Sequence, residues 1–225
     1  MLSSEISPEC ANVYLPQHDS RLLIEVMRRC CHPAGMRVAD LCTGSGVAAI
    51  AAADAGADTV VAFDTSHAAI AAARANARLA GCPIDARLGS WSAAMGLEPF
   101  DLVLCNPPYV PEPANREPVI VGAGGPPASF NAGPDGRLVL DPLCAAAPAL
   151  LRRGGTALIV QSEFADVASS VTALRDGGLQ ADVVARRTIA FGPVMTARAR
   201  WLEDTGRLDP GRRTEELAVI KAVKP

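Results

Sequence analysis

The segment DLCTGSGVAAI, residues 40–50, decides the fold that we expect for this chain. The apolar residues leading up to Asp40 predict a short strand, and the Ala-rich residues from 47 onward predict a helix. Between them, Gly44 and Gly46 allow a sharp backbone turn and the close approach of a ligand. The start of the helix offers unpaired N–H groups to an anionic group such as a carboxylate. This strand–loop–helix unit indicates a Rossmann-like cofactor site with Asp40 at its edge.

A second acidic residue strengthens this prediction. Asp64 ends the next expected strand, 18 residues after Gly46, where a carboxylate can accept hydrogen bonds from both hydroxyls of a ribose. The third glycine of the dinucleotide fingerprint is Ala49 here. These residues therefore predict a cofactor that carries a nucleoside, and they leave NAD and S-adenosylmethionine both open.

The rest of the chain alternates between expected strands and helices. Asp19 or Ser20 is expected to cap the first helix, and Ser66 the third, which should stop at Gly81. The alternation predicts an α/β fold with an open, mainly parallel sheet covered by helices on both faces. The expected strands lie near residues 36–41, 58–64, 84–88, 101–105, 156–160, 181–187 and 216–222, and the expected helices near 20–30, 47–56, 66–80, 138–151 and 163–175.

Composition limits the function classes. The chain has 225 residues, of which 49% are hydrophobic and 20% charged, so we expect one domain, 1–225, with a packed core. Residues 1–10 hold no basic cluster and no apolar run reaches the length of a membrane helix, which favours a cytoplasmic protein without membrane contact. The seven scattered cysteines predict free thiols and no metal site.

The net charge of −3 argues against a protein that grips nucleic acid mainly through phosphates. The charge is uneven, because residues 186–213 hold seven Arg against three acidic residues, a balance of +4 that leaves −7 for the remainder. This segment could form a basic face or a solvated helix face. Residues 191–213 are expected to form a basic insertion with a short helix before the last strand. Residues 110–136, with six Pro and five Gly, predict a lid loop or a segment without a role.

The strand predicted at 101–105 ends in Asn106-Pro107-Pro108-Tyr109. A rigid turn is one explanation, but it needs neither the carboxamide nor the phenol. The side-chain oxygen of Asn106 and the carbonyl of Pro107, aimed by the ring of Pro108, could hold both N–H bonds of a planar –NH₂ group. Tyr109 offers a flat face to that group. The turn therefore predicts catalysis of methyl transfer by positioning, without a strong base.

The chain resembles class I S-adenosylmethionine-dependent methyltransferases that carry an NPPY motif. Within them it is similar to the HemK-type protein glutamine N5-methyltransferases of release factors. The resemblance covers about residues 12–190 and the final strand. It implies a seven-stranded sheet with an antiparallel last strand, S-adenosylmethionine as cofactor and S-adenosylhomocysteine as product. With residues 1–35 as a helical extension, the chain resembles the short branch without an N-terminal helical domain. The motifs that carry it are VYLPQHDSRLL, DLCTGSGV, AFDTS, FDLVLCNPPYVP, AGPDGRLVLDPL and LLRRGGTALIV.

The resemblance also implies roles for individual residues. Asn106, Pro107 and Tyr109 would be catalytic, and together with Pro108 they would bind the substrate. Two departures stand out: Ser90 replaces the usual Asp for the adenine amino group, with Trp91 able to stack instead, and His18 replaces an acidic residue. The expected cofactor-binding residues are Tyr14, Ser20, Asp40, Cys42, Gly44, Gly46, Asp64, Thr65, Ser90, Trp91 and Asn106.

Four readings of the function follow from these features. The favoured one is methylation of a glutamine side chain in a protein of the release-factor type. Methylation of an exocyclic amine on nucleic acid is disfavoured by the net charge and by the 4% aromatic content. Small-molecule methylation and a cofactor-binding module without catalysis stay open. Relatives in the short branch can need an activator subunit at the edge of the sheet, but Asp85 and Arg87 on that edge disfavour pairing.

Overall fold

The computed structural model describes residues 13–114, 120 and 122–225. The first ten residues, on which the expectation of a missing leader rests, lie outside the described residues, as do residues 115–119 and 121 of the proposed lid. Within the described residues, no helix combines the length and the apolar character needed to cross a membrane.

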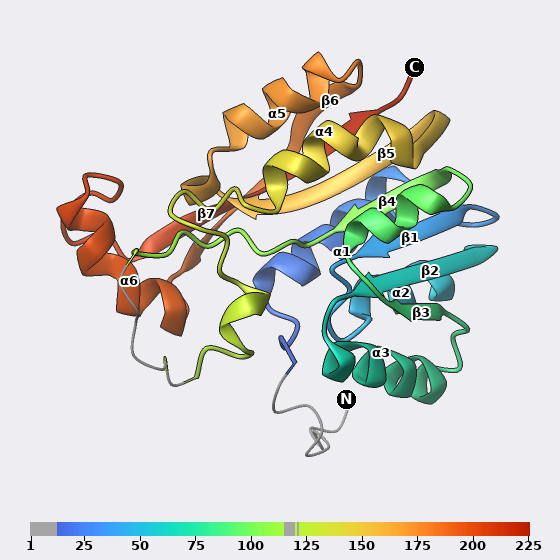
Figure 1. Cartoon of the computed structure of the whole chain (residues 1–225), viewed down its shortest axis with the longest axis horizontal. Coiled ribbons are helices and arrows are strands. Elements are labelled where there is room, and N and C mark those ends of the chain that lie inside the picture. The colour runs from blue at the N-terminus through green and yellow to red at the C-terminus, as the bar shows by residue number, and fades with distance from the viewer. Residues whose placement is uncertain (1–12, 115–119, 121) are drawn as a thin grey trace.

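A seven-stranded sheet forms the centre of the molecule, in the order β3-β2-β1-β4-β5-β7-β6 (Figure 1). Its first five strands in this order pair in parallel, whereas β7 is antiparallel to both β5 and β6. The predicted mainly parallel sheet with an antiparallel last strand is therefore confirmed. The strands are β1 (Arg37–Leu41), β2 (Thr59–Asp64), β3 (Asp85–Leu88), β4 (Phe100–Cys105), β5 (Leu151–Ser162), β6 (Gln180–Ala190) and β7 (Thr214–Val223).

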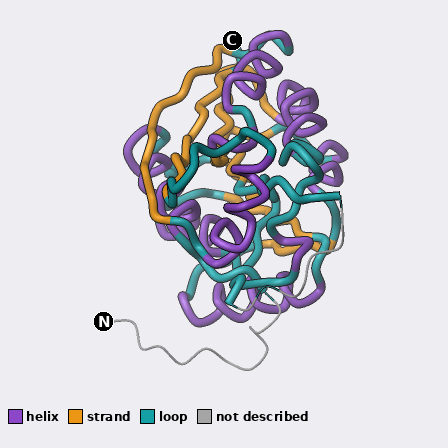
Figure 2. Tube along the Cα trace, turned by 90° about the vertical axis from the view of Figure 1, so that its left-hand side faces the viewer, coloured by secondary structure: helices purple, strands orange, loops and turns teal. Residues whose placement is uncertain are grey.

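Helices cover both faces of this sheet, as Figure 2 shows from the side. On one face, α2 packs between α1 and α3; on the other, α4 packs between α5 and a short 3₁₀ helix at Trp91–Gly96. The helices are α1 (His18–Cys30), α2 (Val47–Asp54), α3 (His67–Ala80), α4 (Leu140–Leu150), α5 (Val167–Asp176) and α6 (Pro193–Asp204). Helix α6 confirms the short helix predicted within residues 191–213.

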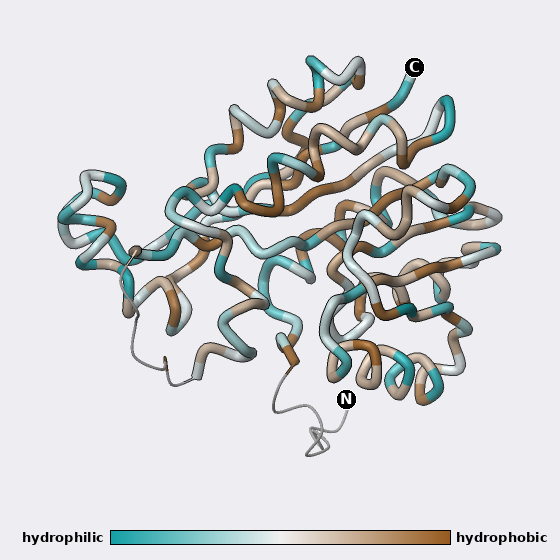
Figure 3. The backbone as a smooth tube through the Cα atoms, in the orientation of Figure 1, coloured by the Kyte–Doolittle hydropathy of each residue, from teal (hydrophilic) through white to brown (hydrophobic). Residues whose placement is uncertain are grey.

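The central strands are buried because helices shield them on both sides. Every residue of β4 is buried, and the hydropathy colouring of Figure 3 is brown along the inner part of β5. Apolar runs such as residues 102–104 and 157–160 are typical of parallel sheets inside α/β proteins. The packing fixes the carboxyl ends of β1, β2 and β4 side by side, since these strands run in register. Ligands of open α/β sheets bind at this edge.

Local sequence signals set several helix boundaries. The Ser66 side chain accepts a hydrogen bond from the backbone N–H of Ala69 at the start of α3, and Gly81 ends that helix in the left-handed conformation. Both predictions are confirmed. The prediction for α1 is wrong: the helix begins at His18 after Gln17, so Asp19 and Ser20 lie inside its first turn. Their side chains face the protein interior instead of capping the helix.

Candidate active site

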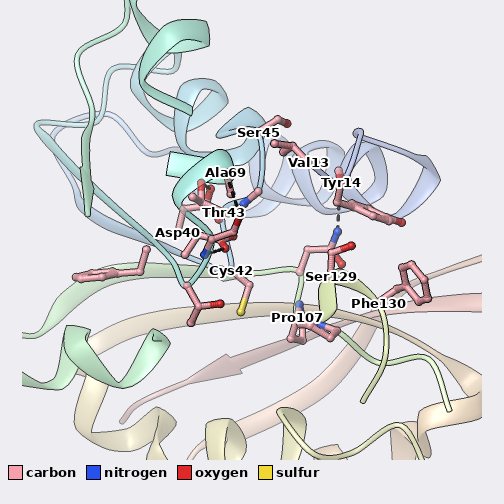
Figure 4. A pocket seen from close by; sticks show the side chains of 18 of the residues that line it. Val13, Tyr14, Asp40, Cys42, Thr43, Ser45, Ala69, Pro107, Ser129 and Phe130 are labelled. Atoms are coloured by element: carbon pink, nitrogen blue, oxygen red, sulfur yellow. Dashed lines mark hydrogen bonds between the residues drawn. The ribbon is translucent and has the colours of Figure 1, made fainter. Parts of the chain in front are cut away.

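A cavity of about 320 Å³ opens at the carboxyl ends of β1, β2 and β4. In Figure 4, Asp40, Cys42 and Thr43 lie on one side of this pocket, and Pro107, Ser129 and Phe130 on the other. The structure thus joins the glycine loop to the Asn-Pro-Pro-Tyr turn. The pocket lining includes all but one of the predicted site residues: Tyr14, Ser20, Asp40, Cys42, Gly44, Asp64, Thr65, Ser90, Trp91, Asn106, Pro107, Pro108 and Tyr109.

Asp40 is the buried acid at the end of β1. Its Oδ2 accepts hydrogen bonds from Thr43 Oγ1 at 2.6 Å and from the backbone N–H of Ala49, in the first turn of α2, at 2.9 Å. Burial raises the pKa of Asp40 to about 7, although both hydrogen bonds act in the opposite direction. A cation entering the pocket would therefore favour the ionised form of this carboxyl group.

Asp64 orders the neighbouring loops. Its Oδ2 accepts the N–H of Gly44 at 2.9 Å, and its Oδ1 accepts the N–H of Ser66 at 2.9 Å. Each oxygen keeps a further lone pair, so the half-buried carboxylate can still accept hydrogen bonds from a ligand. The end of β2 thereby holds the glycine loop and the start of α3 against one pocket wall.

Gly46 is the predicted site residue that does not line the pocket. It precedes α2 in the left-handed conformation, and an added Cβ would lie 2.9 Å from Ala73 Cβ and 3.0 Å from Ala73 Cα. The glycine is therefore needed where α2 approaches α3 closely. The need for glycine at this position comes from helix packing. A sequence pattern alone does not distinguish a glycine needed for packing from one that contacts a ligand.

Ser90 and Trp91 close the pocket beyond β3. Ser90 Oγ accepts a hydrogen bond from the backbone N–H of Ser92 at 3.1 Å and lies 2.7 Å from Ser92 Oγ. The hydroxyl that replaces the usual carboxylate thus already caps a short 3₁₀ helix. His18, the other departure, is exposed on α1 and does not line the pocket.

The Asn-Pro-Pro-Tyr turn follows β4 directly. Asn106 Nδ2 donates a hydrogen bond to Ser20 Oγ at 3.2 Å. Asn106 Oδ1 is buried and has no hydrogen-bond partner among the described residues. A buried acceptor without a partner costs free energy, which a ligand N–H group would recover. Pro107 and Tyr109 are buried beside it.

Asp19 was not predicted as a site residue, yet it lies at the centre of the polar contacts below this turn. The Tyr14 and Tyr109 hydroxyls donate to Asp19 Oδ2 at 2.9 and 3.1 Å. Burial and this carboxylate together raise the pKa of both phenols. The chain has only two tyrosines, and both lie inside the motifs that carry the family resemblance. That coincidence is the one sequence signal that could have indicated a shared partner.

The loop at residues 110–136 is anchored at its two ends. The backbone of Val110 pairs with Phe130 and Ala132, and the N–H of Glu112 donates to the Gly133 carbonyl at 2.9 Å. Ser129 and Phe130 of this loop line the pocket, which no sequence pattern indicated. The ends of the predicted lid are thus tied together immediately after the Asn-Pro-Pro-Tyr turn.

The arginines of residues 186–213 are occupied by contacts within the chain. Arg198 is 1% exposed and donates to the Pro111 carbonyl at 2.9 Å and to Asn131 Oδ1 at 2.6 Å. Arg207 donates to the Pro134 carbonyl. Arg186, Arg187, Arg200, Arg212 and Arg213 form ion pairs with acidic side chains. Arg198 and Arg207 therefore brace the loop at 110–136, whereas Arg200 stays 92% exposed on the surface of α6.

Comparison with known proteins identifies the family. Residues 17–121 match the model of the methyltransferase small domain. The release factor glutamine methyltransferase of Mycolicibacterium smegmatis is 33% identical over 88% of this chain and 70% of its own length. That of Xylella fastidiosa (strain 9a5c) is 35% identical over 79% of this chain and 67% of its own. The chain belongs to the release factor glutamine methyltransferase family. It is therefore a methyltransferase, and the predicted resemblance is confirmed.

A solved structure confirms the class I methyltransferase fold expected of this family. The Mtq2-Trm112 complex of E. cuniculi, described as responsible for methylating the termination factor eRF1, superposes with a TM-score of 0.64 at 20% identity. The match covers 95% of this chain and 99% of that chain. At this identity the likeness establishes the fold alone.

Proposed function

We propose that the chain transfers a methyl group from S-adenosylmethionine to the side-chain amide nitrogen of a glutamine in a protein of the release-factor type. One observation carries the proposal: the buried Oδ1 of Asn106 has no hydrogen-bond partner among the described residues, while its Nδ2 donates to Ser20 Oγ. A ligand with an N–H bond satisfies this oxygen.

The cofactor half of the pocket suits the methyl donor. When bound, S-adenosylmethionine supplies a methyl group on a sulfonium centre and leaves as S-adenosylhomocysteine. Asp64 would hold the ribose, and Ser90 with Trp91 would border the adenine. Tyr14, Ser20, Asp40, Cys42, Gly44 and Thr65 would surround the remainder. The pocket volume of about 320 Å³ is within the range of small-molecule sites.

The acceptor half would be formed by the Asn-Pro-Pro-Tyr turn. Asn106 Oδ1 and the Pro107 carbonyl would each accept one N–H of the glutamine amide, and Tyr109 would lie against its plane. Holding both N–H bonds so that the nitrogen can pyramidalise would localise its lone pair, which would form the N–C bond as the C–S bond to the methyl group breaks. One N–H proton would then pass to water. The rate enhancement would come from positioning, which can supply several orders of magnitude.

The loop at 110–136 would act as the lid of the site, with the insertion at 191–213 as its brace. Ser129 and Phe130 reach the pocket from the loop, and Arg198 ties it to α6. We further propose that the chain acts without an activator subunit. At the β3 edge, Asp85 and Arg87 form an ion pair at 2.5 Å, and charged edges disfavour strand addition.

Nucleic acid is the alternative acceptor, because exocyclic base amines are also planar. Four arginines of residues 186–213 are paired with acidic side chains, which lowers the local positive charge, and the net charge of the chain is −3. Both features favour the protein substrate.

The test is a methyl-transfer assay with the chain alone, labelled cofactor and a release-factor fragment. Mass spectrometry should find one added methyl group on a glutamine, and a fragment with that Gln→Ala substitution should stay unmodified. Oligonucleotides serve as competing acceptors. Transfer to these alone, or to neither, would refute the substrate assignment.

Two variants test the roles proposed for the acceptor half and the cofactor half of the site. Asn106→Ala should leave the cofactor dissociation constant within about twofold and lower turnover at least about a hundredfold, because it removes a positioning contact. Asp64→Ala should weaken cofactor binding about tenfold or more. Equal losses of binding and turnover in Asn106→Ala would contradict its role.

A further inference from the structure

Asp19 is a buried carboxylate held by neutral donors. It is 3% exposed in the first turn of α1. Besides the two tyrosine hydroxyls on Oδ2, its Oδ1 accepts the Ser20 backbone N–H at 2.6 Å and Ser20 Oγ at 3.2 Å. Within the described ranges no ion pair involves Asp19. Four donors and the positive end of the α1 dipole therefore support its charge.

The hydrogen-bond directions connect Asp19 to Asn106. The Ser20 hydroxyl has one proton, which Asp19 Oδ1 accepts. The oxygen of that hydroxyl can then only accept, and it takes the N–H of Asn106 Nδ2 at 3.2 Å. Reversing the Asn106 carboxamide would place two oxygens with lone pairs against each other. Asp19 thus determines which end of Asn106 faces Ser20.

The same carboxylate also contacts the other end of the catalytic turn. Tyr109 follows Asn106 by three residues, and its hydroxyl donates to Asp19 Oδ2 at 3.1 Å. Tyr14, from the segment before α1, donates to the same oxygen. One buried group therefore fixes a carboxamide and a phenol of the turn, both of which line the pocket.

We infer that Asp19 is the positioning residue for the methyl acceptor. Through Ser20 it orients the Asn106 carboxamide so that Oδ1 can accept a hydrogen bond from the substrate. Through its own hydrogen bond it fixes the Tyr109 hydroxyl. The inference rests on the proposed function for its catalytic consequence. Asp19 acts through Ser20, Asn106 and Tyr109, so the loss of its side chain should impair turnover far more than cofactor binding.

The first experiment measures turnover, KM for the fragment and the cofactor dissociation constant of Asp19→Ala. We expect kcat to fall at least about tenfold with the cofactor constant changed by less than about threefold. Asp19→Asn keeps one acceptor oxygen, so its kcat should lie between those of the wild type and Asp19→Ala. This variant replaces Asp19→Ala in the experiment if Asp19→Ala does not fold. The inference is overturned if kcat per folded molecule equals that of the wild type.

Asp101→Ala is the matched control. Asp101 is also a buried aspartate, 8% exposed, and it accepts the backbone N–H of Arg37 at 2.7 Å. It is the second residue of β4, at the end of the sheet away from the pocket, and it also forms an ion pair with Arg152. This substitution should lower the melting temperature and leave kcat within about twofold. If it lowers kcat as much as Asp19→Ala does, a general loss of stability explains both, and the inference fails.

A double-mutant cycle separates positioning from packing. In the Ser20→Ala background the route from Asp19 to Asn106 is cut, so adding Asp19→Ala should cost only the part that runs through Tyr109. Adding Tyr109→Phe to Ser20→Ala should remove that part as well, leaving Asp19→Ala with less than about a twofold effect on kcat. An undiminished effect in both backgrounds would overturn the inference.

A spectroscopic measurement tests the geometry without turnover. The ¹H–¹⁵N side-chain signals of Asn106, assigned by their loss in Asn106→Ala, should shift in Asp19→Ala and in Ser20→Ala but not in Asp101→Ala. Unshifted signals would refute the positioning role even in an active enzyme. Shifted signals in a chain that never methylates glutamine would refute the proposed substrate and retain Asp19 as the positioning residue.

Discussion

Gly136 passes so close to Tyr109 that an added Cβ would lie 2.4 Å from the Tyr109 carbonyl oxygen. The end of the loop at 110–136 thus returns directly across the Asn-Pro-Pro-Tyr turn. Gly136 also adopts the left-handed conformation, with φ of 76°. Both features demand glycine, and they couple the loop to the backbone of the Asn-Pro-Pro-Tyr turn.

Gly136→Ala should therefore displace Tyr109 as well as strain the loop. We expect a loss of about 2–4 kcal/mol in the free energy of unfolding and a fall in turnover of at least about tenfold, since small displacements of positioning groups are costly. Gly133→Ala is the control, because Gly133 has a similar φ of 78° but its added Cβ would only touch Leu138 Cβ at 3.7 Å. Denaturant unfolding and turnover assays on both variants check this. Similar turnover in the two variants would contradict the coupling.

Arg198→Met tests the brace that α6 provides. The substitution removes the hydrogen bonds to the Pro111 carbonyl and to Asn131 Oδ1 in a buried setting. We expect the free energy of unfolding to drop by about 2–4 kcal/mol. Arg200→Met changes a 92% exposed side chain of the same helix and should stay within about 0.5 kcal/mol of the wild type. Chemical denaturation measures both, and equal stabilities would exclude the brace.

The raised pKa of Asp40 predicts pH-dependent cofactor binding. With a pKa of about 7 in the free protein, Asp40 is mostly protonated at pH 6 and mostly ionised at pH 8. The cofactor is cationic at its sulfonium and amino groups, so it should prefer the ionised form. The dissociation constant should fall by up to about tenfold from pH 6 to pH 8. Titration calorimetry should find this slope in the wild type and none in Asp40→Asn; a flat wild-type profile would contradict the prediction.

Glu215 predicts a pH-dependent stability. It is 6% exposed and accepts the Ser162 hydroxyl at 2.6 Å, and burial raises its pKa from 4.5 to about 7. Between these values the folded state binds more protons than the unfolded state, so the free energy of unfolding falls as pH rises and the loss is complete above pH 7. Glu215→Gln should remove up to about 3 kcal/mol of this loss.

Unfolding of the wild type and of Glu215→Gln at pH 4 and pH 8 checks the sign. The variant should gain stability relative to the wild type at the higher pH. Glu98→Gln, at an exposed side chain, controls for the change in net charge. If Glu215→Gln follows the wild-type profile at both pH values, burial of this carboxyl group has no such effect.

The sequence by itself determined the order and type of the main elements and the two halves of the site. Ser66 and Gly81 mark the ends of α3 because a cap and a left-handed stop act on the backbone beside them. The glycine loop and the Asn-Pro-Pro-Tyr turn are equally local, since each lies where a buried strand ends. Parallel pairing then brings these strand ends to one edge without further information.

Only the tertiary structure decided which side chains contact one another across long separations in the sequence. The sequence predicted Asp19 as a possible helix cap, but its side chain accepts a hydrogen bond from Tyr109, 90 residues away. The sequence placed Arg198 in a possible basic face, but its side chain is buried and donates to a carbonyl 87 residues away. Gly46 was predicted to contact the cofactor, and the packed structure shows a further constraint on it, because α2 and α3 meet there. The charge, hydrogen-bonding capacity and backbone freedom of a residue follow from its type. Its contact partner depends on how the helices and the sheet pack, because that packing brings distant segments of the chain together.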